Sequence, residues 1–282
     1  MDIDDRDILM KRPEPIFVAD RFPEILDALL DLLAGLSATE WDAPTVCSGW
    51  SVKDVALHLL GDDVGMLSGR RDGVGGGERI ANWPDLVAFI NDQNARWVQA
   101  TRRISPRLLC DFLRLTGDQV AAYFQSLDPY ALGGPVAWAG PAPAPVWLDL
   151  AREYTERWHH QQQIRDAVWK PGLVQPCYFA PALDAFVRAL PHTFRDVEAA
   201  EGTLVALTIA GDSGGTWFLL NEHDQWNLYL ELAQQPHAEV ILDQDLAWRL
   251  FTKGIGKDDA KATITGDRRL GSQMLEMVSI IA

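Results

Sequence analysis

Apolar residues recur with the period of an α-helix along roughly the first 170 residues of the chain. One stripe predicts a first helix: Phe22, Ile25, Leu26, Leu29, Leu30 and Leu33. A second helix is predicted from Ser51 to Arg70 and Arg71, with Gly73 just beyond its end. Three more are predicted: one between Pro84 and Arg103, one from Ser105 and Pro106 to Leu127, and one from about Val146 to Trp169. The segment PYALGGPVAWAGPAPAP, rich in proline and glycine, has to be a long connection. We therefore expect residues 1–172 to form a helix bundle with one long crossover.

The pattern changes after Pro171 and Gly172. A helix around residues 182–200 is followed by segments of period two that predict strands: TLVALTI, GTWFLL, WNLYLEL, AEVIL and ATIT. In WNLYLEL, alternate residues from Trp226 onward are expected on the buried face and Tyr229 on the other. Asp245 is expected to cap a short helix that ends near Lys253 and Gly254, and DRRLGSQMLEMVSIIA a closing helix. Residues 173–282 are thus predicted to be an α+β domain with a small antiparallel sheet.

Two of the predicted helices carry side chains that suit a metal site. In SGWSVKDVALHLLGDD, Ser51 is followed by Asp54 as in a capping box, and Trp50 and Val55 are spaced as in a hydrophobic staple. A helix that starts there places His58 two turns along it. In REYTERWHHQQQIRDAV, Glu156 and His160 are four residues apart and share a helical face.

Packing these two helices side by side would bring His58, Glu156 and His160 together. Three nitrogen and oxygen ligands leave a fourth position open, which is the arrangement of a catalytic zinc rather than a structural one. His159 is rotated by about 100° from His160, so it is expected to support or pack rather than to bind. Asp62, one turn after His58, could reach the metal, orient His58 as an outer acceptor, or be a solvated carboxylate.

Ordinary structural roles could also account for these residues, without any metal binding or catalysis. A lone histidine on an amphipathic helix is commonly a core or boundary residue, and this applies to His58. Glu156 and His160 could form an intrahelical pair worth only about 0.2–0.5 kcal/mol. Gln163 and Arg165 could bind a polar cofactor or simply cover the surface of the bundle.

Composition narrows the choice of partners. The formal net charge of −15 and the isoelectric point near 4.7 oppose binding to nucleic acid or to anionic membranes. The segment MDIDDRDILMKRPEP lacks the features of a signal peptide, and no apolar run has the length of a membrane span, so a cytoplasmic location is expected. Cys47, Cys110 and Cys177 fit neither a disulfide framework nor a zinc-ribbon spacing, and buried free thiols are expected.

Three segments together resemble the mycothiol-dependent maleylpyruvate isomerase family, part of the DinB-like metal-binding superfamily: GWSVKDVALHL, the E-x-x-x-H helix that ends in HQQQIRDA, and GDRRLGSQMLEMVSI. The resemblance implies an N-terminal all-α DinB-like four-helix bundle that holds zinc or another divalent metal, and a C-terminal α+β domain resembling the sterol carrier protein fold. The family's metal ligands correspond to His58, Glu156 and His160. Mycothiol or a related low-molecular-weight thiol is the implied cofactor. Arg249, Arg268 and Arg269 are candidates for a C-terminal arginine implicated in the isomerase.

The resemblance implies an enzyme that acts with a small-molecule thiol on a small electrophilic substrate. The metal would bind the thiol as a thiolate, which adds to the substrate or displaces a group from it. Addition followed by elimination gives isomerisation, and displacement gives S-transfer. Two alternatives stay open. One is a non-catalytic small-molecule-binding protein in which Asp62, as fourth ligand, completes the coordination sphere of the metal. The other is a metal-assisted hydrolase with Asp62 as general base. The oligomeric state stays open as well.

Overall fold

The computed structural model describes residues 10–74 and 82–280. These fall into two compact units: a helical unit of residues 17–74, 82–130 and 153–173, and a sheet unit of residues 10–16, 131–152 and 174–280. The expected domain boundary near residue 172 stays a prediction. Most of the segment on which the absence of a signal peptide was argued, residues 1–9, lies outside the described residues. No helix among the described residues is both long and apolar enough to cross a bilayer.

The helical unit contains the helices that the apolar periodicity predicts. They are α1 (Phe22–Ala34), α3 (Val52–Gly65), α4 (Trp83–Thr101), α5 (Pro106–Gln125) and the second part of α6 (Val146–Ala167). The unit also contains a short helix that the periodicity did not predict, α2 (Ala38–Trp41). A short 3₁₀ turn (Ala19–Arg21) precedes α1, and α3 continues into a π-helical segment (Met66–Arg71), so the predicted helix reaches Arg71 with a change in winding. Helices α1 and α3 both pack on α5, and α4 packs on α3.

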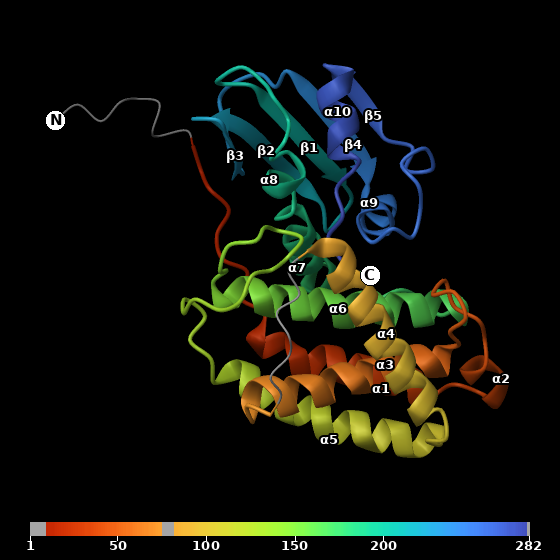
Figure 1. Cartoon of the computed structure of the whole chain (residues 1–282). Helices are drawn as coiled ribbons and strands as arrows, with labels where there is room; N and C mark the ends of the chain where they lie inside the picture. Colours follow the sequence, from red (N-terminus) through yellow and green to blue (C-terminus); the bar gives the residue numbers. More distant parts are fainter. Residues whose placement is uncertain (1–9, 75–81, 281–282) are drawn as a thin grey trace. The chain divides into compact units, whose positions relative to one another are not determined.

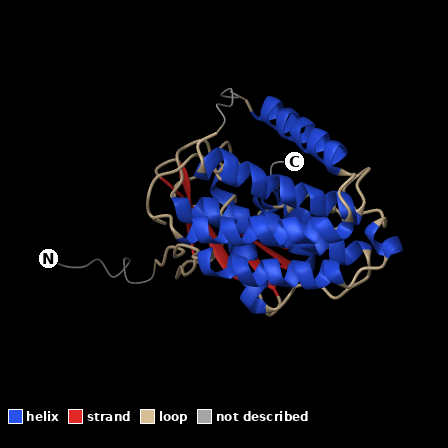
Figure 2. Ribbon diagram, turned by 90° about the horizontal axis from the view of Figure 1, so that it is seen from below, coloured by secondary structure: helices blue, strands red, loops and turns tan. Residues whose placement is uncertain are grey.

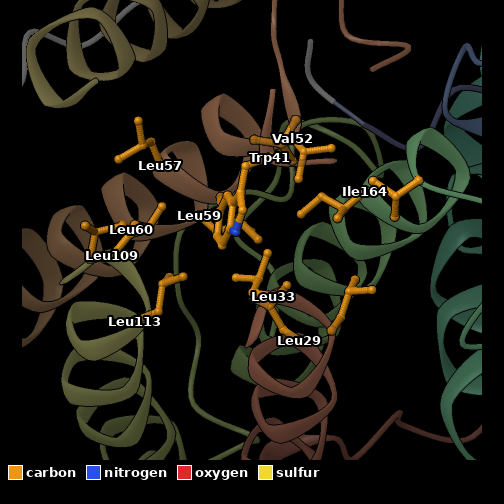
Figure 3. Packing of buried hydrophobic residues seen from close by; sticks show 14 of the residues in the cluster. Leu29, Leu33, Trp41, Val52, Leu57, Leu59, Leu60, Leu109, Leu113 and Ile164 are labelled. Atoms are coloured by element: carbon orange, nitrogen blue, oxygen red, sulfur yellow. The ribbon is translucent and has the colours of Figure 1, made fainter. Parts of the chain in front are cut away.

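The core of this unit is aliphatic, as Figure 3 shows. Leu29 and Leu33 of α1 meet Trp41 of α2, and these residues pack with leucines of α3 and α5 and with Ile164 of α6. Each such side chain contributes about 1.5–3 kcal/mol on burial. The predicted α1 stripe omits Leu32, which is buried, and its member Leu30 packs against the core while only partly buried.

The sheet unit has five strands in the order β3-β2-β1-β4-β5 (Figure 1), and they are the red arrows of Figure 2. The strands are β1 (Leu204–Ala210), β2 (Gly215–Glu222), β3 (Gln225–Tyr229), β4 (Ala238–Asp243) and β5 (Thr263–Gly266). Strand β4 pairs with β1 in parallel, so the predicted antiparallel sheet is in fact mixed. The reason is the connection: the chain leaves β3 at one edge and returns beside β1, where the backbone N–H of His237 donates to the Leu204 carbonyl.

The helices of the sheet unit differ in extent from the prediction. They are α7 (Pro176–Val187), α8 (Leu190–Thr193), α9 (Gln244–Phe251) and α10 (Arg268–Met274). The helix expected over 182–200 therefore starts earlier and is broken after Val187. The cap of α9 is Asp243, whose carboxylate accepts from the N–H of Asp245, so the expected cap at Asp245 is wrong. The closing helix ends at Met274 and is shorter than predicted.

Strand β3 also ends sooner than predicted, at Tyr229. Tyr229 is only 3% exposed, although the alternation placed it on the open face. Its hydroxyl donates to Glu222 at 2.6 Å and accepts from Arg12 at 3.5 Å. A segment outside the strand pattern, around Arg12, thus covers the face that the alternation alone leaves open.

Candidate metal centre

A closed loop before α3 fixes the helix start and with it the position of His58. Ser51 accepts from the N–H of Asp54, and the Asp54 carboxylate accepts from the N–H of Ser51, so the predicted capping box is formed. Arg102 holds the same carboxylate with two bonds of 2.9 Å. These bonds account for the lowered pKa of Asp54, since they outweigh the effect of its burial, which is to raise it. His58 lies two turns further along, buried on α3.

Helix α6 presents the second set of ligand-type side chains. Residues 158–164 are buried without interruption, so this part of α6 is covered on more than one face. Glu156 and His160 lie one turn apart, with the Glu156 Oε2 atom 3.5 Å from His160 Nε2. The helix is anchored on both sides: Trp158 donates to the Leu173 carbonyl and Gln161 to the Ile25 carbonyl.

The two helices bring the predicted ligands together. The Nε2 atoms of His58 and His160 are 3.1 Å apart, and both imidazoles are buried. Asp62 adds a second carboxylate, with its Oδ2 atom 3.3 Å from His58 Nε2. Each imidazole therefore has one carboxylate beside the nitrogen that faces the other imidazole.

The protonation states follow from these contacts. Burial, followed by the charge of His160, lowers the pKa of His58 to about 3. Burial also opposes charge on His160, but the Cys47 sulfur and the Glu156 carboxylate outweigh it and raise the pKa of His160 to about 10. His58 is thus neutral and accepts from the Nε2–H of His160. Burial, with the charge of Glu156, raises the pKa of Asp62 to about 8.

The geometry of the two imidazoles fits a tetrahedral cation. Ligands at about 2.0–2.1 Å from a tetrahedral zinc are separated from one another by about 3.3–3.4 Å. The distances from His58 to His160 and to Asp62, and from His160 to Glu156, are close to this value. Among the described residues, however, no three or more histidine, cysteine, aspartate or glutamate side chains converge tightly enough to form a finished metal site. A cation would have to displace the proton between the imidazoles, as metal binding to histidine ordinarily requires.

Other side chains surround the two imidazoles. The Trp50 ring lies on His58, with ring centroids 5.3 Å apart. Gln163 Oε1 lies 2.8 Å from His160 Nδ1 and 3.2 Å from the Cys47 sulfur. His159 does not point at the ligand position, because its Nε2 accepts from Gln163. The loop that brings in Cys47 and Trp50 is closed by backbone bonds between Thr45 and Trp50 and turns at Gly49, where φ is +78°.

A buried ion cluster lies next to the site. Arg157 donates to Asp63 and to Glu153, each at 2.8 Å, and its guanidinium lies over the rings of Phe22 and Phe124. Burial disfavours the charge on Arg157, but the two carboxylates hold its pKa above the usual value. Burial likewise raises the pKa of Asp63, with Arg157 opposing the rise. A cavity of about 30 Å³, room for about one water, is lined by Asp63, Arg157, Gln161 and otherwise apolar residues.

Other candidates from the sequence have structural partners. Arg165 donates to the Ala28 and Pro171 carbonyls and to Gln161, which is a helix-anchoring role. In the sheet unit, Arg249 is paired with Asp245, Arg269 donates to the Glu198 carbonyl, and Arg268 is exposed.

The three cysteines are free, as expected, but the expectation of burial is wrong. Cys47 and Cys110 are partly covered, and Cys177 is exposed. Cys47 donates to Gln163 beside the imidazoles and also packs against the hydrophobic core, which accounts for its partial burial.

Comparison with known proteins adds a family and a fold. Residues 22–165, just over half of the chain, match the family described as mycothiol maleylpyruvate isomerase N-terminal domain. Two solved structures are similar: the mycothiol-dependent maleylpyruvate isomerase, and a mutant of it in which a histidine is replaced by alanine. Each has a TM-score of 0.53 at 10% sequence identity and covers 88% of this chain and 91% of its own. This likeness shows a shared fold of a helical N-terminal region and a mixed-sheet domain. No curated protein matches the chain at a significant level.

Proposed function

Because this chain belongs to the mycothiol maleylpyruvate isomerase family, we propose that it is a metal-dependent enzyme that uses a low-molecular-weight thiol, of the mycothiol kind, to isomerise a small electrophilic molecule. Transfer of the thiol to such a molecule is the closest variant of the same chemistry. Within this proposal the helices form a DinB-like four-helix bundle, and the sheet unit has a sterol-carrier-like fold.

One observation carries the proposal: the facing Nε2 atoms of His58 and His160, 3.1 Å apart with a carboxylate beside each. This donor set suits zinc or a comparable divalent ion. We assign His58, Glu156 and His160 as the ligands. A divalent ion held there would lower the pKa of a bound thiol, so that the thiol reacts as thiolate at neutral pH.

The remaining side chains prepare the site. Trp50 covers one side of His58 and limits the approach of water. The ion cluster of Arg157, Asp63 and Glu153 holds α3 and α6 together with bonds that are shielded from solvent. The Asp62 carboxyl group, whose Oδ2 atom lies 3.3 Å from His58 Nε2, is within reach of a substrate bound beside His58, and we assign it to proton transfer there.

A second candidate function follows from the position of Asp62. Its carboxylate is as close to His58 as a fourth ligand would be. If Asp62 completed the coordination sphere together with the three assigned ligands, the protein would bind a metal and a small ligand without catalysing a reaction. The two candidates differ in whether an added thiol can reach the metal.

The test is the thiol-dependent isomerisation of maleylpyruvate by the purified protein, with metal content measured on the same sample. We expect about one divalent ion per chain. His58→Ala and His160→Ala should each lose metal and activity, whereas the control His223→Asn, in a turn of the sheet unit, should keep both. Full metal occupancy in the His58→Ala, His160→Ala double variant would refute the assignment of the ligands. A wild-type protein that holds metal but leaves maleylpyruvate unchanged with mycothiol would refute that substrate.

A further inference from the structure

Three consecutive glutamines on α6 are buried, yet each meets different partners. Gln161 donates to the Ile25 carbonyl and accepts from Arg165. Gln162 bonds to the backbone N–H and C=O of Leu173. Successive side chains on a helix point about 100° apart, so a run of one residue type is distributed over three directions. Within the described residues, Gln163 alone of the three contacts imidazoles.

The contacts of Gln163 define the protonation of both histidines. An amide oxygen only accepts, so Gln163 Oε1, 2.8 Å from His160 Nδ1, requires a proton on that nitrogen. The same oxygen accepts from the thiol of Cys47. The amide nitrogen donates to His159 Nε2 at 2.9 Å. The opposite orientation of the amide would place a donor against His160 Nδ1, so the neutral ring would keep its one proton on Nε2, the atom that faces His58, and Nε2 could not become a ligand.

We propose that Gln163 is a positioning residue for the metal centre: it holds the proton of His160 on Nδ1, so that Nε2 is available as a ligand beside His58. This inference rests on the proposed function, because it concerns a metal held by these histidines. It assigns to the third glutamine a role that the other two do not share. A partner that fixes the tautomer of a ligating histidine typically changes metal affinity by about 10–100-fold.

The experiment compares three full-length variants by titration with Co²⁺ alone, under competition with a chelator, and by the visible absorption of the bound ion. Gln163→Met keeps the length of the side chain but removes its acceptor. Gln163→Glu keeps an acceptor, because a carboxylate also accepts from Nδ1–H. Gln162→Leu removes a neighbouring buried amide that does not touch the imidazoles, and it is the matched control for loss of packing.

We expect Gln163→Met to bind Co²⁺ about 10–100-fold more weakly and with an altered spectrum. Gln163→Glu should bind at least as tightly as wild type with the wild-type spectrum. Gln162→Leu should lower the melting temperature but leave Co²⁺ affinity unchanged. If Gln163→Met does not fold, the Gln163→Glu variant decides alone: tight binding supports the proposal, and weak binding overturns it.

Unchanged affinity and spectrum in Gln163→Met would overturn the inference and leave the proposed function intact. An equal loss of affinity in Gln162→Leu would also overturn it, because the effect would then be one of general packing. If the wild-type protein binds no Co²⁺, the metal centre itself is wrong, and the inference falls with it.

Discussion

Replacing Arg157 by methionine should destabilise the helical unit more than any exposed charge substitution in it. Arg157→Met keeps an unbranched side chain of similar length but removes the guanidinium that bonds to Asp63 and Glu153. Both acceptors are buried, with exposed fractions of 4% and 6%, so water cannot readily replace the lost donors. Two carboxylates that share one cation in the native protein would be left without it.

The magnitude follows from the two bonds of 2.8 Å. Hydrogen bonds to charged groups contribute about 1.5–3 kcal/mol each, and breaking a buried ion pair by removing one partner costs about 3–5 kcal/mol. We therefore expect the free energy of unfolding to fall by about 3–5 kcal/mol. In a domain of this size that corresponds to a drop in melting temperature on the order of 10 °C.

The assay is thermal and urea unfolding of the metal-free protein at several pH values, monitored by circular dichroism. Burial already raises the pKa of Asp63, and without the opposing charge of Arg157 its folded-state pKa should rise further above that of the unfolded chain, about 4. An acid whose folded pKa is raised destabilises the fold above that pKa, and the penalty fades as the pH falls toward the unfolded value. The deficit relative to wild type should therefore be full at pH 7 and smaller near pH 4.5.

The control is Arg114→Met, because Arg114 also pairs with two carboxylates, of Asp27 and Asp118, but its side chain is 45% exposed. Its removal should cost no more than about 1 kcal/mol. Equal effects of Arg157→Met and Arg114→Met, or a deficit for Arg157→Met that does not change with pH, would refute the reasoning about burial.

Three further substitutions test local features of the helical unit. Ser51→Ala removes the side-chain half of the capping box and should cost about 1 kcal/mol in urea unfolding; no loss would mean that the cap does not stabilise α3. Gly61→Ala should lower the free energy of unfolding by about 1–3 kcal/mol, although alanine has the better helix propensity. The new Cβ would lie 2.7 Å from the Trp97 ring, and that ring is fixed by its bond to the Leu57 carbonyl. A variant more stable than wild type would contradict this. Glu156→Gln keeps the side-chain volume but replaces an anionic ligand with a weaker neutral one, so metal retention and thiol-dependent activity should fall. The melting curve of the metal-free protein should change little. Full retention of metal would exclude Glu156 as a ligand.

The sequence predicts well those features that depend on neighbours along the chain. The start of α3 follows from Ser51 and Asp54, three residues apart, and the shared face of Glu156 and His160 follows from helical spacing. The meeting of His58 with His160, 102 residues later, depends on how α3 and α6 pack. The sequence pattern only allowed for side-by-side packing, and the resemblance to a family then supported the same ligand set. The same resemblance says nothing about Cys47, because its loop carries no ligand motif.

Features set by partners distant in sequence were missed or wrong. Period-two alternation identifies β1 and β4 as strands but does not say that they run parallel, since pairing is a tertiary property. Asp243 and Asp245 are equally good cap residues by type, and only the backbone geometry selects Asp243. The sequence offered Gln163 only as a contact for a polar cofactor or as cover for the bundle surface, so its burial against two histidines was not predicted.

The central claim is that His58, Glu156 and His160 hold a divalent ion whose open position accepts a thiol. X-ray absorption at the zinc edge of the reconstituted protein, recorded before and after addition of mycothiol, measures this directly. The account predicts a first shell of nitrogen and oxygen at about 2.0–2.1 Å that gains one sulfur at about 2.3 Å when the thiol is added. A shell of four protein ligands that includes Asp62, is lost in Asp62→Ala, and does not change with thiol would contradict it and favour the non-catalytic binding protein.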